Sequence, residues 1–495
     1  MGPRTAAPGT ARTAVRSRAR WGGLGGVVLL IVALAPCRAS AGDVTIRSRT
    51  YGEGYVVLVP GSEGRLLRRR RLAQILSLGV FDLLPPDPAA DPARRGRLGF
   101  RATVRIRHDF GDFQRRAAGR AATLVRAEDG RAVDLLGAAL EGRRLFGALD
   151  LRIGRQIDQY GLDFFAFDGG FVRVRTPVPV AFEALGGLAV RATDLLGYPE
   201  MSVDGVPPTE VSTGPRFVAG GGVLVDGPSW IFGRVGYRQV FERSAPAAPG
   251  EPPRRRVAEE ILSAQVRLRL AKGIVSPYGA VRYDVAGARV SDLSLGTDLA
   301  FGGGRHLLRV QYLRTHPVFD LDSVFNVFFT TPFSDVRLGY QVNLGRTALH
   351  ARWQVRRMLA DRTASGAEPP ARALGGTGVQ AGVSHRRRRF ALRADAFARG
   401  GPEGRLGGAS VEARTFVFHQ RLALDTRAYY TYVDGVGSTA GGGHLWAVQI
   451  GTDTRLYSGI HLHLLVEEAG SPTMRSSFRV FGALSLDWQI RGGTR

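Results

Sequence analysis

The chain has 495 residues, a formal net charge of +25 and a single cysteine, Cys37. One cysteine excludes a disulfide framework and a thiolate metal site. Lys272 is the only lysine among 68 basic residues, and 66 glycines without a collagen repeat indicate turns and bent sheets rather than helices.

Residues 1–41 have the composition of a secretory signal peptide. Five arginines precede an apolar stretch at 27–35, and Ala39-Ser40-Ala41 offers a small-residue cleavage site. The apolar stretch is too short for a membrane-spanning helix, which needs about 20 residues. A lipoprotein signal ending at Cys37 is the alternative, but Pro36 occupies a position that is normally small. Cleavage after Ala41 would also remove Cys37.

Residues 42–97 allow two interpretations. They form the first strands of the main fold, or a segment that lies partly in the periplasm or inside the fold. The stretch RLLRRRRLAQILSLGVFDLL at 65–84 fits a strand after a basic turn or an amphipathic helix. The stretch GRAATLVRAEDGRAVDLLGAAL at 119–140 is ambiguous in the same way.

From residue 98 to the end, apolar and polar residues alternate over long runs. FRATVRIRHDF at 100–110 is one example, and 262–270, 336–344, 349–356 and 478–490 repeat the pattern. Soluble strands average about five or six residues, whereas a tilted strand that crosses a bilayer needs about 9 to 11. The alternation therefore predicts membrane-spanning strands with one apolar side.

The spacing of turn residues supports an up-and-down arrangement. We predict short turns near 271–274, 302–304, 344–346, 385–388, 419–421 and 452–454. We predict longer loops at 243–256, 315–333, 360–375, 400–407, 433–442 and 468–475. A short joint near 286–289 breaks this alternation. The pattern predicts an all-β fold: one transmembrane antiparallel up-and-down β-barrel of about 18 to 22 strands, even in number, over residues 98–495.

Residues 149–177, LDLRIGRQIDQYGLDFFAFDGGFVRVRTP, resemble a segment of Gram-negative outer-membrane porins. In that segment a strand ends in Gly-Arg-Gln, here 154–156, and Asp-Gly, here 168–169, opens the next strand after a loop. The resemblance implies an integral protein of the bacterial outer membrane. Its implied partners are outer-membrane lipid and lipopolysaccharide, small solutes and the barrel-assembly machinery, while the oligomeric state stays open.

We find no motif for catalysis or for a cofactor. Gly-x-Ser-x-Gly, the Walker loop and His-Glu-x-x-His are absent from the sequence, so we expect no catalytic residue and no cofactor. His461, His463 and Glu467 share a strand face, but period two makes such coincidences common, and we expect no metal. Most arginines are dispersed singly, which does not favour nucleic-acid binding. The basic clusters 68–71 and 385–389 are more simply explained by contact with lipid headgroups or solvent than by binding of nucleic acid.

Arginine on the lipid face at mid-depth costs about 2 to 4 kcal/mol, so the strand arginines are predicted to face the lumen. The predicted pore-lining residues are Arg101, Arg105, Arg107, Arg152, Arg173, Arg175, Arg267, Arg269, Arg337, Arg352, Arg356, Arg393, Arg414 and Arg427. The acidic residues expected on the same side are Asp109, Asp150, Asp298, Asp335, Asp395, Glu412, Asp425 and Asp487. Structural arginine–carboxylate ladders and true anion selectivity both remain open.

Three functions are compatible with these features of the sequence. The first is a porin-like channel for passive diffusion of small polar or anionic solutes through an arginine-lined lumen. The second is a non-conducting barrel that serves as a receptor, adhesin or assembly scaffold. The third, least favoured, is a membrane-embedded hydrolase.

Overall fold

The computed structural model describes twelve stretches of the chain. They are 43–58, 66–84, 96–109, 133–190, 215–243, 255–315, 332–359, 375–401, 404–418, 421–434, 442–472 and 474–490. The predicted signal peptide lies outside the described residues.

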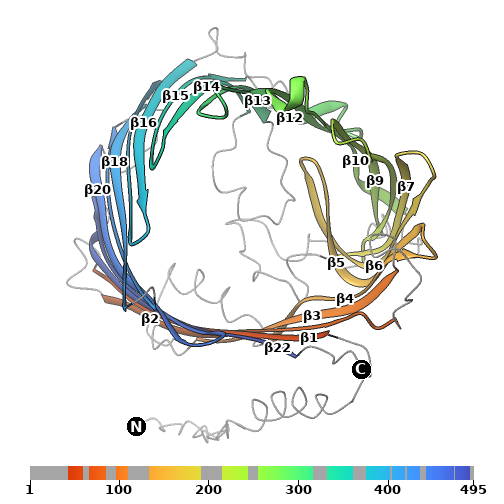
Figure 1. The fold of residues 1–495 in the computed structure, drawn as a ribbon, viewed down its shortest axis with the longest axis horizontal. Coiled ribbons are helices and arrows are strands. Elements are labelled where there is room, and N and C mark those ends of the chain that lie inside the picture. Colours follow the sequence, from red (N-terminus) through yellow and green to blue (C-terminus); the bar gives the residue numbers. More distant parts are fainter. Residues whose placement is uncertain are drawn as a thin grey trace, which may run out of the picture.

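Almost every described residue belongs to a strand (Figure 1). The strands are β1 Asp43–Leu58, β2 Leu66–Phe81, β3 Arg97–Asp109, β4 Val133–Leu145, β5 Leu149–Tyr160, β6 Asp163–Arg175, β7 Val180–Ala189, β8 Phe217–Asp226, β9 Ile231–Arg243, β10 Arg255–Leu268, β11 Val275–Asp284, β12 Arg289–Phe301, β13 His306–Thr315, β14 Phe333–Leu344, β15 Thr347–Met358, β16 Gly375–Arg387, β17 Phe390–Gly401, β18 Gly404–Val417, β19 Leu422–Asp434, β20 Gly443–Tyr457, β21 Ile460–Ser471 and β22 Met474–Ile490. A 3-10 turn, Ala271–Gly273, connects β10 to β11.

These strands close into one ring (Figure 1). Each strand pairs antiparallel with its neighbours in sequence, and β1 pairs with β22. Closure leaves no free sheet edge, which is the condition for a sheet to cross hydrocarbon. The prediction of an all-β barrel with an even number of strands, between 18 and 22, is confirmed. The number of strands is 22, the upper end of that range.

The two ambiguous N-terminal stretches are now placed. Residues 66–81 form β2 in the barrel wall, so the amphipathic helix is wrong for this stretch, and the cluster 68–71 lies in a strand rather than a turn. β1 is also a wall strand. Of the second stretch, 133–140 belongs to β4, and the remainder lies outside the described residues.

Most predicted connections are confirmed, and three are wrong. The predicted turn at 452–454 lies inside β20, and the chain turns instead at 458–459. The predicted long loops at 400–407 and 468–475 are each a connection of two residues, 402–403 and 472–473. In both cases strand pairing continues up to the connection, with Gly401 paired to Gly404 and Ser471 paired to Met474.

Directly paired residues of neighbouring strands lie on the same face of the wall. Apolar residues pair with apolar residues, so they collect on one face of the wall, which is the outer face. Val310, Leu338, Trp353, Val379 and Ala398 form one such row across β13 to β17. Leu338, Trp353 and Val379 remain 41%, 44% and 56% exposed, as expected for side chains that face lipid. In the described part of the chain no helix has the length and apolarity to cross a bilayer.

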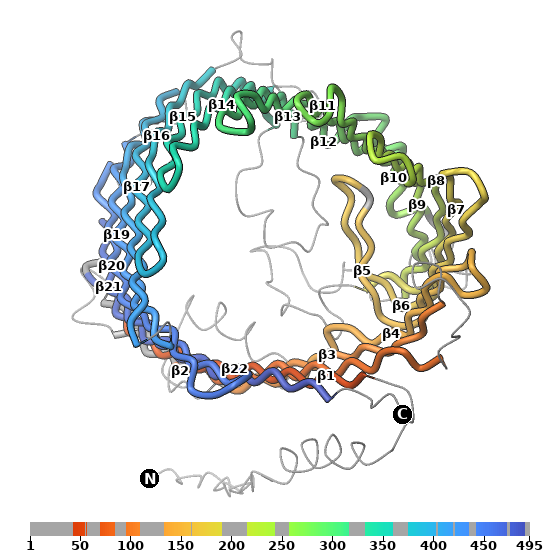
Figure 2. The backbone as a smooth tube through the Cα atoms, in the orientation of Figure 1, coloured from red at the N-terminus to blue at the C-terminus, as the bar shows by residue number. Residues whose placement is uncertain are grey.

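One hairpin departs from the ring. β5 and β6 leave the wall and turn into the interior of the barrel (Figure 2). A row of paired glycines, Gly154, Gly169 and Gly187, crosses β5, β6 and β7 at this bend. Gly154 has a φ of +124°, and a Cβ there would overlap the backbone oxygen of Ala138. The strands can therefore approach one another closely only because these positions carry no side chain.

The hairpin packs on the interior through an apolar cluster. Phe167 and Phe171 of β6 are buried with Leu185, Val218 and Val240 from β7, β8 and β9. Within the described stretches, this cluster is the main apolar contact inside the barrel.

We predict that Gly154→Ala destabilises the barrel by more than about 2 kcal/mol, since it adds a clash to a backbone angle that L-residues avoid. The measurement is the temperature at which the refolded protein loses its folded mobility on a gel. Gly170→Ala is the matched control, because a Cβ at Gly170 meets nothing within 4 Å. Equal unfolding temperatures for the two variants would contradict this account of the bend.

Candidate functional site: the inner face of the barrel wall

The hairpin identifies the inner face of the wall. Its tip contacts β9 and β11, where Arg238 and Arg282 bind Asp163 and Arg234 donates to the Gln159 carbonyl. The hairpin lies inside the ring, so these arginines face the lumen (Figure 2). Directly paired residues lie on the same face, so the pairing register identifies the inward-facing residues of every other strand, starting from β9 and going around the ring in both directions.

By this pairing, thirteen of the fourteen arginines predicted to line the pore share the inner face. Examples are Arg105 opposite Asp134, Arg173 opposite Glu183, and Arg393 opposite Glu412. Arg269 lies just beyond the end of β10, and it lines a recess together with the inward-facing Arg267. Thirteen of the positions therefore run along the inside of the wall from β3 to β19, and Arg269 lies just past the end of β10.

Nine of the fourteen arginines form ion pairs with carboxylates. They are Arg105, Arg107, Arg152, Arg173, Arg175, Arg337, Arg356, Arg393 and Arg414. Two carboxylates are fully buried and each bind two arginines. Asp134 lies 2.8 Å from Arg105 and 3.0 Å from Arg107, and Asp335 lies 2.8 Å from both Arg337 and Arg356. These arginines form a structural ladder along the wall.

The other five arginines have no such partner within the described part of the chain. They are Arg101, Arg267, Arg269, Arg352 and Arg427. Arg101 instead lies over the ring of Phe81, with 5.1 Å between the guanidinium carbon and the ring centroid. The inner face thus holds both a paired ladder and arginines that form no ion pair within the described part of the chain.

The tip of the hairpin is fastened to the wall by a buried ion-pair cluster. Asp163 is 2% exposed and accepts two hydrogen bonds of 3.0 Å from Arg238. Arg282 lies 3.3 Å from the same carboxylate, and Glu259 binds both arginines. Arg238 also stacks over Phe165 at 4.5 Å. Removing one member of such a buried cluster leaves an uncompensated charge, which costs about 3 to 5 kcal/mol.

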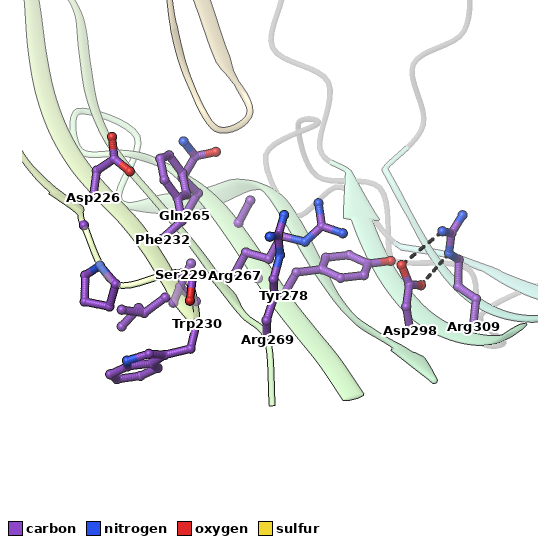
Figure 3. Close-up of a pocket in the computed structure, with 16 residues that line it drawn as sticks. Asp226, Ser229, Trp230, Phe232, Gln265, Arg267, Arg269, Tyr278, Asp298 and Arg309 are labelled. Carbon is purple, nitrogen blue, oxygen red and sulfur yellow. Dashed lines mark hydrogen bonds and ion pairs between the residues drawn. The ribbon is translucent and has the colours of Figure 1, made fainter. Parts of the chain in front are cut away.

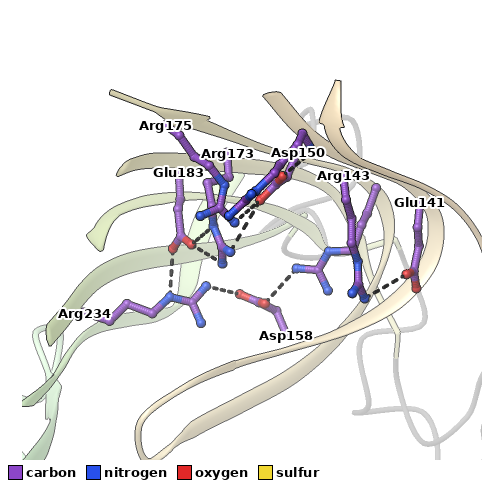
Figure 4. A network of polar contacts seen from close by, with 10 residues as sticks. Glu141, Arg143, Asp150, Asp158, Arg173, Arg175, Glu183 and Arg234 are labelled. Atoms are coloured by element: carbon purple, nitrogen blue, oxygen red, sulfur yellow. Dashed lines mark hydrogen bonds and ion pairs between the residues drawn. The ribbon is translucent and has the colours of Figure 1, made fainter. Parts of the chain in front are cut away.

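A second network joins the middle of the hairpin to the wall (Figure 4). Asp158 of β5 lies 3.0 Å from Arg152 and 3.3 Å from Arg234, and Arg234 continues to Glu183 at 2.8 Å. Arg173 binds the other side of Glu183 at 2.6 Å. The hairpin is therefore fixed inside the ring, held against the wall at Asp158 and Asp163 (Figure 2).

The segment that resembled porins has a different local structure from the one expected. Gly154-Arg155-Gln156 does not end a strand, and Asp168-Gly169 does not open one. Both lie inside long strands, in direct register, with Gly154 opposite Gly169 and Arg155 opposite Asp168. Arg155 binds Asp168 with nitrogen–oxygen distances of 2.7 and 2.5 Å. The turn itself is Gly161-Leu162.

The residues that fasten the hairpin were not among the predicted ones. Arg234, Arg238 and Arg282 alternate with apolar residues in β9 and β11, so the same period-two pattern could have found them. Asp158, Asp163 and Glu259 gave no such signal. These carboxylates meet their arginine partners only because the hairpin leaves the wall, and the local sequence does not specify that the hairpin bends inward.

A recess of about 800 Å³ lies beside the short turns after β8 and β10 (Figure 3). Arg267, Arg269 and Tyr278 line it, while Arg309 binds Asp298 at 2.6 Å. Two cations without a carboxylate partner among the described residues thus meet in one recess of the inner wall.

The histidines of β21 do not build a metal site with Glu467. Both lie beside Asp453 instead, with nitrogen–oxygen distances of 3.8 Å for His461 and 3.7 Å for His463. Glu467 contacts Gln449 and Arg479. Over the described residues, no group of three or more potential ligands lies close enough together to hold a metal ion.

Comparison with known proteins gives no family. No protein-family model and no curated protein matches the chain. Among solved structures, OccAB4 of Acinetobacter baumannii is 8% identical, with 90% of this chain and 98% of that chain covered and a TM-score of 0.44. A BenF-like porin from Pseudomonas fluorescens Pf-5 is 10% identical, with 91% and 99% covered and a TM-score of 0.44. Pseudomonas aeruginosa OpdK with vanillate is 13% identical, with 91% and 99% covered and a TM-score of 0.41.

The class of protein follows from the fold itself. A closed antiparallel ring with an apolar outside and a polar, charged inside is the architecture of an integral outer-membrane β-barrel.

We predict that Gly161→Cys combined with Gln265→Cys forms a disulfide, because a Cβ at Gly161 would lie 3.3 Å from the Gln265 Cβ. Disulfides join Cβ atoms about 3.5 to 4.5 Å apart. The measurement is the gel shift of the oxidised, refolded barrel. Adding Asp163→Asn should slow cross-linking by releasing the tip. A pair of Gly161→Cys with Gln380→Cys on a distant strand should stay reduced, and equal cross-linking of both pairs would contradict the docked hairpin.

Proposed function

We propose that the protein is a passive diffusion channel for small polar solutes, with a preference for anions. The observation that carries the proposal is a polar-lined ring of 22 strands whose described interior holds a wall-anchored hairpin rather than a folded domain. Barrels of 16 to 18 strands already leave an aqueous passage, so we expect a wider ring with one hairpin in its described interior to leave room for solute and water.

The expected selectivity comes from the balance of charge on the inner face. An arginine that pairs one-to-one with a carboxylate contributes little net field, because such a pair is close to neutral. The two groups in which two arginines share Asp134 or Asp335 each keep one positive charge. Arg267, Arg269 and Arg352 lack such partners among the described residues and project into recesses of the inner wall. In a cleft with low-dielectric walls, unbalanced cations raise the local concentration of anions and exclude cations.

A hydrolase fits the described residues less well. His350 lies 2.7 Å from Asp395, a pairing that a catalytic triad would use. However, Arg393 binds the same carboxylate at 2.6 Å, and no serine hydroxyl in the described stretches bonds to His350. We therefore assign the His350–Asp395 pair to the wall ladder.

A non-conducting barrel that serves as a receptor, adhesin or scaffold is the second candidate. The inward hairpin favours the non-conducting barrel, because the hairpin occupies part of the lumen. Rings of 22 strands are also known with a plugged lumen. Electrical recording separates the two functions directly.

We predict stepwise single-channel conductance with anion preference when the refolded barrel is inserted into a planar bilayer. Arg267→Ser with Arg269→Ser should lower the anion-to-cation permeability ratio about twofold or more, since two unbalanced charges leave the recess. The control is Asp298→Ser with Arg309→Ser, which removes a neutral pair from the same recess. A folded but silent barrel would contradict the channel, and an unchanged ratio in the Arg267/Arg269 variant would contradict the role of these arginines.

A further inference from the structure

One rim of the barrel carries an arginine within three residues of each of six consecutive hairpin turns. The turns join β10 to β11, β12 to β13, β14 to β15, β16 to β17, β18 to β19 and β20 to β21. Long connections such as 316–331 and 360–374 leave from the opposite rim, so the rim with the short turns faces the periplasm. The six arginines, which we call the collar, are Arg269, Arg305, Arg346, Arg386, Arg421 and Arg455, and all six are exposed.

The pairing register places two members of the collar side by side on the inner face of the wall. Arg386 shares a face of β16 with Ser384, whose partner on β17 is the inward-facing Arg393. The backbone N–H of Arg386 donates to the Arg346 carbonyl at 2.8 Å, which continues the register of β15 and β16. Arg346 and Arg386 are therefore neighbours across adjacent strands, on the side of the lumen.

A second pair has the same arrangement. Arg455 shares a face of β20 with Asp453, which Arg414 binds from the inner face at 3.0 Å. The backbone N–H of Arg455 donates to the Arg421 carbonyl at 2.7 Å, in register with the pairing of β19 and β20. Arg421 and Arg455 are therefore also neighbours on the inner side.

The remaining two members also follow inward-facing positions. Arg269 comes two residues after Arg267, and both line the recess beside the turn after β10 (Figure 3). The Arg305 carbonyl accepts a hydrogen bond of 2.8 Å from the backbone N–H of Asn343, which shares a face of β14 with the inward-facing Arg337. The collar thus follows the inner edge of the periplasmic mouth.

The collar carries positive charge without acidic residues in its turns. The turns 269–274, 302–305, 345–346, 388–389, 418–421 and 458–459 contain no aspartate or glutamate. None of the six arginines forms an ion pair within the part of the chain that the structure describes. Like charges directly opposite each other on neighbouring strands are destabilising, yet the collar contains two such pairs. An anionic group bound from the periplasm would relieve this repulsion.

The side and the length of the collar favour a protein over a lipid headgroup or a single small anion. Headgroups of the inner leaflet surround the outside of the wall, where the outward-facing Arg387 can reach them, whereas the collar follows the inside. From β10 to β20 the collar extends over ten strand spacings of about 4.7 to 4.9 Å, which is roughly 50 Å along the wall. A standard protein interface, with about 800 Å² buried on each side, has a comparable extent.

We propose that the collar binds the acidic face of a soluble periplasmic protein at the mouth of the barrel. Complementary charge speeds the encounter of two proteins and fixes their register. The collar occupies the side of the mouth formed by β10 to β21, so the bound protein lies on that side and leaves the turns between β4 and β9 uncovered. Binding does not require conduction, so a silent barrel would leave this proposal intact.

The test uses a fluorescently labelled poly-L-glutamate peptide as the acidic probe and measures its binding to the refolded full-length barrel by anisotropy at low salt. We expect the wild-type barrel to bind the peptide, and a collar variant to bind it roughly tenfold or more weakly, since four cations leave the mouth. The collar variant combines Arg346→Ser, Arg386→Ser, Arg421→Ser and Arg455→Ser. The matched control combines Arg70→Ser, Arg314→Ser, Arg357→Ser and Arg405→Ser, which remove four exposed arginines at the opposite rim and should keep the affinity.

Three results would overturn the proposal. One is equal affinity of the wild-type barrel and the collar variant for the peptide, or an equal loss in the control variant. Another is loss of peptide binding when the barrel is moved from phosphatidylcholine nanodiscs to phosphatidylglycerol nanodiscs, which would assign the collar to headgroups. The third is absence of peptide binding while purified peptidoglycan binds the wild-type barrel and not the collar variant, which would assign the collar to the cell-wall polymer. Folded mobility on a gel confirms that each variant is intact before binding is measured.

Discussion

The structure depends on one constraint: every backbone N–H and C=O group within the hydrocarbon must bond to another strand. Pairing of β1 with β22 meets it by closing the ring. Closure then gives each strand an outside and an inside, so residue type must alternate along the strand. Apolar rows such as Leu338–Trp353–Val379 face lipid, and arginines such as Arg337, Arg352 and Arg356 lie inside. The polar lumen is thus a consequence of closure rather than a separate feature.

Inside the ring, the alternation of apolar and polar residues places arginines on the inner face, and some of these arginines hold a hairpin against the wall. Glycines at 154, 169 and 187 let β5 and β6 bend away from the wall. Carboxylates at 158 and 163 then meet arginines that would otherwise face the lumen. Buried charges of this kind specify one arrangement more than they add stability, because breaking a pair is costly while forming it gains little. The position of the hairpin inside the ring therefore rests on a few ion pairs.

The fold could be predicted from the sequence where the pattern is local. Alternation of apolar and polar residues over nine or more positions determined the strands, their membrane-spanning length and the shared face of the arginines. Prediction failed where tertiary context decides. The glycines near 402 and 472 mark tight turns rather than loops, and β2 looked equally like a helix because its apolar positions fit both periods. The hairpin could not be predicted, since Gly154 and Asp163 acquire their roles only after the ring has closed.

Alternate residues of each strand face water inside the barrel and lipid outside it, and both the wall and the proposed channel depend on this. Labelling of single cysteines in β3 by a charged, membrane-impermeant thiol reagent tests it most directly, with the barrel refolded in vesicles and Cys37 absent. Thr103→Cys should react, while Ala102→Cys and Val104→Cys, on the opposite face, should not. Equal labelling of all three positions, or the reverse pattern, would contradict the account.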